Sequence, residues 1–570
     1  MTHPRCMRLL LLAVASALLS LTAAAQDSTS PDHTAQMDRL FAEYTVEGSP
    51  GAAVGVYRHG KILFAKGYGL ADLEARTPIT PQTQFHVASV SKQFAAFAVA
   101  LLAQRGQLDL DADVRRYLPY FPDFGAPVTT RQLVHHTSGV RDQISLFQLA
   151  GRDIRDVLRQ QQVVNLMSRQ RSLNFAPGSS YLYSNMGYCL LAEIVQSVTG
   201  KSLRQYTDEA MFEPLGMTRT FFFDDVREVV PGRAYSYGAG VDGRWQRSLL
   251  NFELVGATGL FTTVEDMARW AGNFSEPKVG DRALIEQIGT SGRLNDGSLT
   301  HYGFGLLDTP VAGRKAVSHA GSDAGFRSFF VYFPEHDVSI AVLANTRMAV
   351  EDKVFAIADL YLPPVPPEKK VVRRTVAAPK WFEQLPGTYV SSANAAYLFE
   401  QTKEGVTARR RTPGRAAPLV MLADGTFTFD LGDWDRARYR PIFSKQGSIT
   451  ALEQLPEAGV SSVRFERAPL PNQAESALLA LTGSYYCDEL DVTYYFTVEQ
   501  GRLVARTLWS AEPLRLTQIA ADYFDSERFD GIDAVIFDRG ADGAVLGARL
   551  RSTVGIANNV QLRRLSGGPR

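Results

Sequence analysis

The hydrophobic pattern divides the chain into two regions of different character. Residues 31–361 mix helical and strand patterns, with a strong helix pattern over 93–102 and a strand pair at 326–333 and 338–343. After residue 380, short alternating apolar and polar runs separated by turn signals replace the helical pattern. This order predicts an α+β region followed by an all-β region.

The all-β region repeats itself. Leu385–Tyr389 (Leu-Pro-Gly-Thr-Tyr) is similar to Leu481–Tyr485 (Leu-Thr-Gly-Ser-Tyr), at an offset of 96 residues. Val463–Arg467 is similar to Val560–Arg564, at an offset of 97. Matches in the same order at nearly one period predict two small β domains, each a barrel or a strongly twisted sheet.

The first 25 residues have the features of an export signal. Arg5 and Arg8 precede the apolar run of Leu9 to Leu21, and alanines follow at 23–25. A run of about 13 apolar residues is too short to cross a bilayer. We therefore expect a secreted or periplasmic bacterial protein with no membrane anchor after cleavage. The expected organisation is a signal peptide at 1–25, an α+β domain at 31–361, a proline-rich basic linker at 362–380, and β domains at 381–469 and 477–567.

Composition narrows the class of protein. Lys plus Arg and Asp plus Glu each number 60, so the formal net charge is zero, and a nucleic-acid partner is not expected. The three cysteines, Cys6, Cys189 and Cys487, are too few for a disulfide framework or a zinc cluster. A bridge between Cys189 and Cys487 stays open at this point.

The first candidate chemistry is Ser89-x-x-Lys92 at the start of the strong helix pattern. Residues three apart share a helix face, so the two side chains would lie about one turn apart. A buried lysine with a lowered pKa can take the proton of a serine nucleophile. Taken alone, the pair also fits an ordinary helix surface. A second copy, Ser275 to Lys278, contains Pro277, which would break the helix that aligns such a pair.

Two further motifs carry polar groups suited to acyl transfer. Tyr183-Ser184-Asn185 is expected in a loop just before a helix; a tyrosine can move a proton, and an asparagine can bind a substrate amide. His319-Ala320-Gly321-Ser322 precedes the strand pair, and small residues there let a ligand approach the backbone. The backbone N–H groups of Ser322 and Ser89 could form an oxyanion hole. Singly, each motif also fits a purely structural role.

Together, in this order, the three motifs resemble those of the serine β-lactamase and DD-peptidase superfamily. Four other segments resemble accessory segments of its class C-like branch: Leu133–Gly139, Pro214–Met217, Gly259–Thr263 and Tyr302–Gly305. The tandem β domains resemble the architecture of D-aminopeptidases. The resemblance implies an α+β fold, with an antiparallel sheet flanked by helices beside an all-helical subdomain carrying Tyr183. Helices near 33–45 and 350–361 would then pack on strands at 51–57, 62–69 and 326–343.

The resemblance also implies a role for each motif residue. Ser89 would attack a carbonyl and form an acyl-enzyme, Lys92 would take its proton, and Tyr183 would relay that proton. Asn185, His319, Gly321 and Ser322 would bind the substrate. Histidine at 319 stands where β-lactamases carry lysine, and it is charged only conditionally near neutral pH, so β-lactamase activity ranks lower.

The resulting hypothesis is an exported serine hydrolase, a peptidase or esterase of small molecules or peptides. Its substrate would be an ester or a D-residue peptide, with an aminopeptidase or carboxypeptidase type of cleavage. The alternative is a sensor or scaffold that binds penicillin or cell-wall peptides without turnover. No cofactor is expected, and no metal either, because His135-His136 has no further ligand cluster beside it. The oligomeric state stays open.

Overall fold

The computed structural model describes residues 33–366, 375–410, 415–431, 437–455, 462–471, 474–509, 512–527, 531–552 and 556–566. The predicted signal peptide lies outside these residues, as does the centre of the predicted linker, 367–374. Within the described part of the chain, no helix is both long and apolar enough to cross a bilayer.

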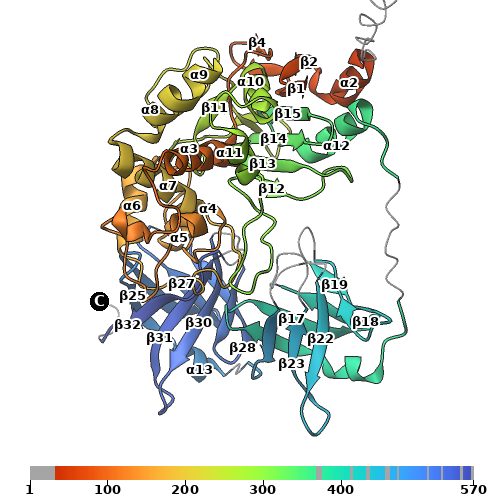
Figure 1. Ribbon diagram of the computed structural model, residues 1–570. Coiled ribbons are helices and arrows are strands. Elements are labelled where there is room, and N and C mark those ends of the chain that lie inside the picture. Colours follow the sequence, from red (N-terminus) through yellow and green to blue (C-terminus); the bar gives the residue numbers. More distant parts are fainter. Residues whose placement is uncertain are drawn as a thin grey trace, which may run out of the picture.

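A six-stranded antiparallel sheet forms the centre of the α+β region (Figure 1). Its order is β12 (Leu307–Asp308), β13 (Val317–Asp323), β14 (Phe326–Phe333), β15 (Val338–Ala344), β1 (Ala52–Arg58) and β2 (Lys61–Tyr68). Every residue of β15 is buried, as expected for a central strand covered on both faces. Helices α2 (Thr34–Leu40) and α12 (Val350–Tyr361) share one apolar core with the sheet. Helix α10 (Val264–Ser275) packs on β1, β2 and β15.

The helical subdomain lies beside this sheet. Its central helix, α3 (Lys92–Gln104), is buried from Lys92 to Leu102, as a helix that is apolar all round must be. The helices around it are α4 (Thr130–Val134), α5 (Gln143–Leu149), α6 (Gln160–Ser168), α7 (Asn185–Thr199), α8 (Leu203–Thr207), α9 (Glu213–Leu215) and α11 (Arg282–Ile288). A small sheet of β5 (Phe85–His86), β11 (Leu260–Thr262) and β7 (Phe221–Phe222) leads the chain into α3.

Both C-terminal units are barrel-like, and the predicted α+β and all-β fold class is confirmed. The first is a nine-stranded sheet whose terminal strands, β19 and β20, flank the single residue Leu419, so the two ends of the sheet meet. The second is a closed eight-stranded barrel. The first unit contains β16 (Gly387–Ser391), β17 (Ala396–Thr402), β18 (Gly405–Arg409), β19 (Ala416–Pro418), β20 (Val420–Met421), β21 (Phe427–Thr428), β22 (Arg438–Phe443), β23 (Ile449–Gln454) and β24 (Val463–Arg467). The second contains β25 (Gly483–Cys487), β26 (Val492–Glu499), β27 (Arg502–Arg506), β28 (Leu514–Ala520), β29 (Tyr523–Ser526), β30 (Ile532–Arg539), β31 (Val545–Ser552) and β32 (Val560–Arg564).

The internal repeat is visible in matched contacts. Tyr389 pairs with Arg467 across β16 and β24, and Tyr485 pairs with Arg564 across β25 and β32. In both units the arginine guanidinium lies over the tyrosine ring, at 5.6 and 5.8 Å. The same sequence signature therefore builds the same strand pairing twice.

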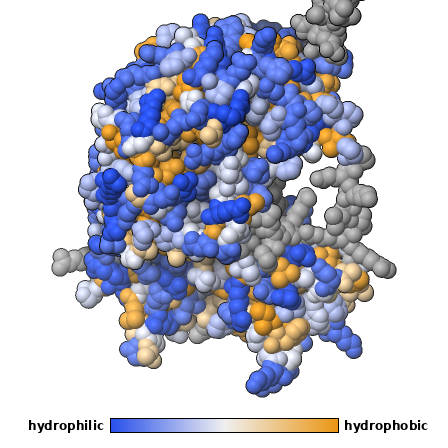
Figure 2. All heavy atoms as spheres, in the orientation of Figure 1, coloured by the Kyte–Doolittle hydropathy of each residue, from blue (hydrophilic) through white to orange (hydrophobic). Residues whose placement is uncertain are grey.

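The second barrel packs directly against the helical subdomain, below α5 and α6 in the view of Figure 1. Hydrophilic residues cover most of the molecular face drawn in Figure 2.

Cys189 and Cys487 are both buried and both free. The disulfide bridge that the sequence left open between them is therefore not formed.

Candidate active site

Ser89 lies in a tight turn that the surrounding structure fixes in place. This Ser89 turn (Ala88–Ser91) is a 3₁₀ turn leading into α3, and Ala88 adopts a φ of 47°, a conformation that costs a non-glycine residue energy. The Ser91 hydroxyl donates to the Ala88 carbonyl at 2.5 Å and accepts from the Leu260 N–H at 3.0 Å. The Ala88 N–H donates to His86 Nδ1 at 3.3 Å. The strained backbone is thus held on both sides before Ser89.

Lys92 is completely buried, and its Nζ lies 3.1 Å from Ser89 Oγ. It also lies 2.7 Å from Asn185 Oδ1 and 2.7 Å from the Ala257 carbonyl, both of which can only accept. Burial lowers the pKa of the Lys92 amine to about 7. A neutral amine has two N–H groups for those two acceptors, so its lone pair is left to face the Ser89 hydroxyl.

Tyr183 covers the same amine. Its ring centroid is 4.8 Å from Lys92 Nζ, and the neighbouring Ser89 side chain acts on the pKa of its hydroxyl. Burial raises the pKa of Tyr183 well above its ordinary value, so the phenol stays protonated at neutral pH. Ser89, Lys92 and Tyr183 therefore form one connected set of proton donors and acceptors.

Asn185 is oriented by a residue that no motif contained. Asp142 Oδ2 accepts from the Asn185 backbone N–H at 2.8 Å and from its side-chain Nδ2 at 2.9 Å. These bonds fix which way the amide points and direct Oδ1 to Lys92. The prediction that Asn185 lies in a loop is wrong, because Asn185 is the first residue of α7 and Ser184 is its N-cap.

His319 lies on β13 and is held as a neutral imidazole. Its Nδ1 is 2.6 Å from the Ala320 carbonyl, which can only accept, so Nδ1 carries the proton. Its Nε2 is 2.9 Å from the Tyr302 hydroxyl and accepts from it. Burial lowers the pKa of His319 to about 3. The conditional charge expected at this position is therefore absent at neutral pH.

Gly321 and Ser322 lie on the same strand, against the Ser89 turn. A Cβ at Gly321 would come within 2.3 Å of the Val87 carbonyl, so only glycine fits there. The two-residue hairpin after β13 makes Asp323 and Phe326 its closing pair, and the pairing continues at Gly321 with Ser328. Ser322, between them, directs its N–H away from β14, to the open edge of the strand. An oxyanion could be bound from that edge.

An aromatic wall around Lys92 was not predicted from the motifs. The His136 ring lies 4.3 Å from that of Tyr183, 4.6 Å from Tyr302 and 5.1 Å from Tyr188. His136 and Tyr302 belong to segments that the family resemblance singled out, and Asp142 follows one of them, but no residue there had an assigned role. Among the described residues no group of three or more potential metal ligands occurs.

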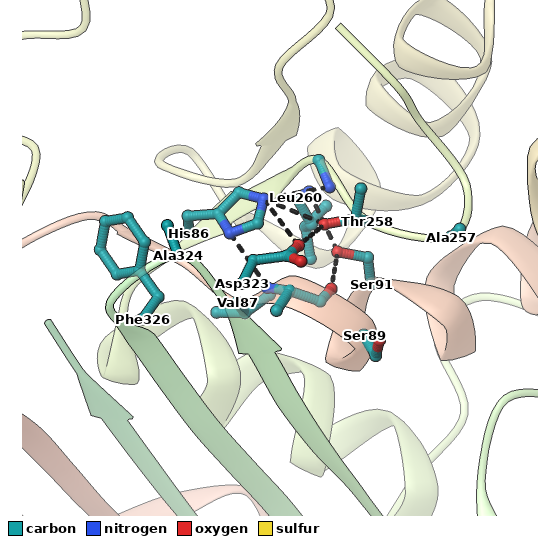
Figure 3. Close-up of polar contacts among 12 residues, drawn as sticks. His86, Val87, Ser89, Ser91, Ala257, Thr258, Leu260, Asp323, Ala324 and Phe326 are labelled. Atoms are coloured by element: carbon teal, nitrogen blue, oxygen red, sulfur yellow. Dashed lines mark hydrogen bonds and ion pairs between the residues drawn. The ribbon is translucent and has the colours of Figure 1, made fainter. Parts of the chain in front are cut away.

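A polar cluster of His86, Thr258 and Asp323 lies beside the Ser89 turn (Figure 3). The Thr258 hydroxyl donates to Asp323 Oδ2 and lies 3.1 Å from His86 Nε2. Burial lowers the pKa of His86 to about 3 and raises that of Asp323 to about 6. His86 is therefore neutral, while Asp323 is mainly ionised above pH 6.

The second barrel reaches the helical subdomain next to Asp142. Arg141, whose side chain is fully buried, donates to Glu489 Oε2 at 2.5 Å and to the backbone carbonyls of Asn558 and Asn559 at 3.0 Å each. The Asp142 N–H donates to the Ile556 carbonyl at 3.0 Å. The segment that orients Asn185 is thus bonded on its other side to the barrel.

Comparison with known families gives one match over more than half of the chain. Residues 37–360 match the family model described as Beta-lactamase. This range includes Ser89, Lys92, Tyr183 and Asn185, as well as His319.

Two curated relatives are D-aminopeptidases. The protein from Gluconobacter oxydans is 28% identical over 474 residues, which are 82% of this chain and 84% of that protein. The protein from Brucella canis is 30% identical over 339 residues, which are 58% of this chain and 63% of that protein. The Gluconobacter match is longer than the family match, so it extends into the C-terminal β region.

Solved structures share the fold at low sequence identity. The octameric penicillin-binding protein homologue from Pyrococcus abyssi is 24% identical and has a TM-score of 0.52, covering 76% of this chain and 100% of that one. SurE is 22% identical, with a TM-score of 0.53 over 76% of this chain and 97% of its own. The D-amino acid amidase from Ochrobactrum anthropi is 23% identical, with a TM-score of 0.50 over 58% of this chain and 98% of its own.

Proposed function

The chain belongs to the beta-lactamase family, and on that premise we propose that it is a D-aminopeptidase that releases the amino-terminal D-residue from a peptide or amide. The chain is a serine hydrolase. The observation that supports this chemistry is the buried Lys92 amine. Its pKa is lowered, and its two N–H groups are taken by fixed acceptors, so its lone pair is directed at the Ser89 hydroxyl. The choice of substrate is supported by two D-aminopeptidases among the relatives, one matched over 82% of this chain.

Acylation begins with proton transfer from Ser89 Oγ to neutral Lys92 as Oγ attacks the carbonyl carbon. The negative charge that develops on the carbonyl oxygen is stabilised by the N–H groups of Ser89 and Ser322. Tyr183 passes a proton to the departing amine nitrogen and takes one back from protonated Lys92, and the carbon–nitrogen bond breaks. The products of this half-reaction are the free amine and an ester of Ser89.

Deacylation repeats the same steps with water. Neutral Lys92 accepts a proton, through Tyr183, from the water that attacks the ester carbonyl, and returns it to Ser89 Oγ as that oxygen leaves. Asn185, fixed by Asp142, positions the acyl group in both half-reactions. The neutral His319 offers no cation to the carboxylate of a β-lactam, which favours a substrate without a carboxylate at this position.

We expect the purified chain to hydrolyse D-alanine p-nitroanilide at least about 100-fold faster, in kcat/KM, than the L-isomer. A fluorophosphonate should add to the wild type and not to Ser89→Ala, as measured by intact-protein mass. Ser275→Ala, in the second Ser-x-x-Lys copy, is the matched control and should be labelled like the wild type. A preference for the L-isomer would contradict the proposed substrate, and labelling of Ser89→Ala would contradict the nucleophile.

A further inference from the structure

The strand that lines the site carries a carboxylate with no assigned role. Alternate residues of a strand share a face, so His319, Gly321 and Asp323 point to the same side of β13. The middle position, Gly321, meets the Ser89 turn, and His319 lies beside Tyr183, with ring centroids 6.3 Å apart. Asp323 therefore lies on the other side of Ser89 from Tyr183, about 13 Å along the strand from His319.

Lys92 and Arg327 act electrostatically on Asp323, but among the described residues neither forms an ion pair with it. Among the described residues, its only ion-pairing neighbour is His86, 3.9 Å away, and that imidazole is neutral. Asp323 Oδ2 accepts from Thr258, whereas no hydrogen bond to Oδ1 occurs within the described part of the chain. About a fifth of its side chain (21%) is exposed.

The other carboxylate whose charge acts on Lys92 is already fully used. Asp142 is completely buried, and its oxygens accept from Ser145 N, Asn185 N and Asn185 Nδ2. Asp142 can therefore orient Asn185 but has no open oxygen for a ligand. Asp323, which also acts electrostatically on Lys92, is partly exposed on the strand against which a substrate would lie.

We propose that Asp323 forms the subsite that binds the α-ammonium group of the amino-terminal residue of the substrate. This inference rests on the proposed function, because only an aminopeptidase presents a primary ammonium group on the acyl side of the bond that is cleaved. Tyr183 delivers a proton to the leaving amine, so the leaving group lies on the Tyr183 and His319 side of Ser89. The acyl group then extends to the opposite side, where Asp323 lies.

The Thr258 and His86 pair gives this subsite its geometry. Thr258 holds Oδ2 in place, so that the open Oδ1 faces a ligand as a fixed acceptor (Figure 3). His86 also accepts from the Ala88 N–H, which connects the subsite to the backbone that carries Ser89. An ammonium bound here replaces its lost hydration with a charge-assisted hydrogen bond. An N-acylated substrate loses that bond and leaves Asp323 Oδ1 without a hydrogen-bond donor.

The test is competitive inhibition of p-nitrophenyl acetate hydrolysis by D-alanine amide and by N-acetyl-D-alanine amide. Wild type should bind the free amine about 10- to 100-fold more tightly than the acetylated analogue. In Asp323→Asn this ratio should fall to about one, while kcat/KM for p-nitrophenyl acetate changes less than about threefold. Glu335→Gln removes the same charge from the exposed turn after β14 and should keep the wild-type ratio.

Three results would overturn the assignment: a wild-type ratio near one, an unchanged ratio in Asp323→Asn, or loss of ester hydrolysis in that variant. The last would place Asp323 in the reacting machinery instead. Ammonia release from D-alanine amide is measured in parallel. If wild type prefers the free amine but releases no ammonia, the proposed function fails and the ammonium subsite stands.

Discussion

Replacing Lys92 by methionine is expected to lower kcat/KM by about 10³-fold or more for both ester and amide substrates. Removal of a general base costs about 10²- to 10⁴-fold, and the loss is larger when the same group also acts in the second half-reaction. Methionine fits the buried site by size but has no lone pair basic enough to accept the Ser89 proton. A variant that keeps more than a tenth of wild-type activity would show that another group acts as the base.

The same lysine sets the expected pH dependence of activity. Burial places the pKa of Lys92 near 7, so the base is protonated and inactive in acid and becomes competent as the pH rises through about 7. We expect kcat/KM for p-nitrophenyl acetate to rise over this range. The residual activity of Lys92→Met should not follow that titration.

Stability gives a second readout that does not depend on turnover. The amine has its ordinary pKa of 10.5 when the chain is unfolded and a pKa of about 7 when it is folded. Between these values the unfolded state binds more protons, so the free energy of unfolding rises with pH, by up to about 1.4 kcal/mol per pH unit. Lys92→Met should lose this rise. Denaturant unfolding of both proteins between pH 7 and 9 measures the difference.

The hydrophobic periodicity of the sequence predicted the helices and strands well, because each element depends mainly on residues close together in the chain. The helix pattern at 93–102 lies inside α3, and the predicted strand pair coincides with β14 and with β15, which continues to Ala344. The repeat of 96 to 97 residues predicted two β units because equivalent strands carry equivalent residues. Helix α7 began earlier than expected. Asp142, distant in sequence, supplies the acceptor for the backbone N–H of Asn185.

The motifs named residues that the structure brings together around Lys92, but not the groups that give them their properties. The Ala257 carbonyl, Asp142 and Tyr302 act through contacts between segments far apart in the chain, and a backbone carbonyl has no sequence signature at all. The protonation state of His319 is one property that the sequence motif could not predict. Only the partners of its two ring nitrogens show that it is neutral.

A contact between segments still farther apart in the chain leads to the second expected result, a large loss of stability in Glu489→Gln. Glu489 and Arg141 are 348 residues apart and join the second barrel to the helical subdomain, with side-chain exposures of 2% and 0%. Glutamine keeps the shape but leaves the arginine charge buried without a counter-ion. Breaking a buried ion pair in this way costs about 3–5 kcal/mol. The midpoint of thermal unfolding should fall by about 5 to 10 °C.

An exposed ion pair at the same interface provides the control. Arg169 and Asp491 are 2.9 Å apart, with side-chain exposures of 50% and 57%, so Asp491→Asn should cost less than about 1 kcal/mol. Because the barrel is bonded next to Asp142, we also expect Glu489→Gln to lower kcat well below its thermal midpoint, with little change in ester KM. If the two variants lost the same amount of stability, the buried ion pair would contribute no more to the interface than the exposed one. If Glu489→Gln were as stable as the wild type and had a normal kcat, the barrel would have no role in positioning Asn185.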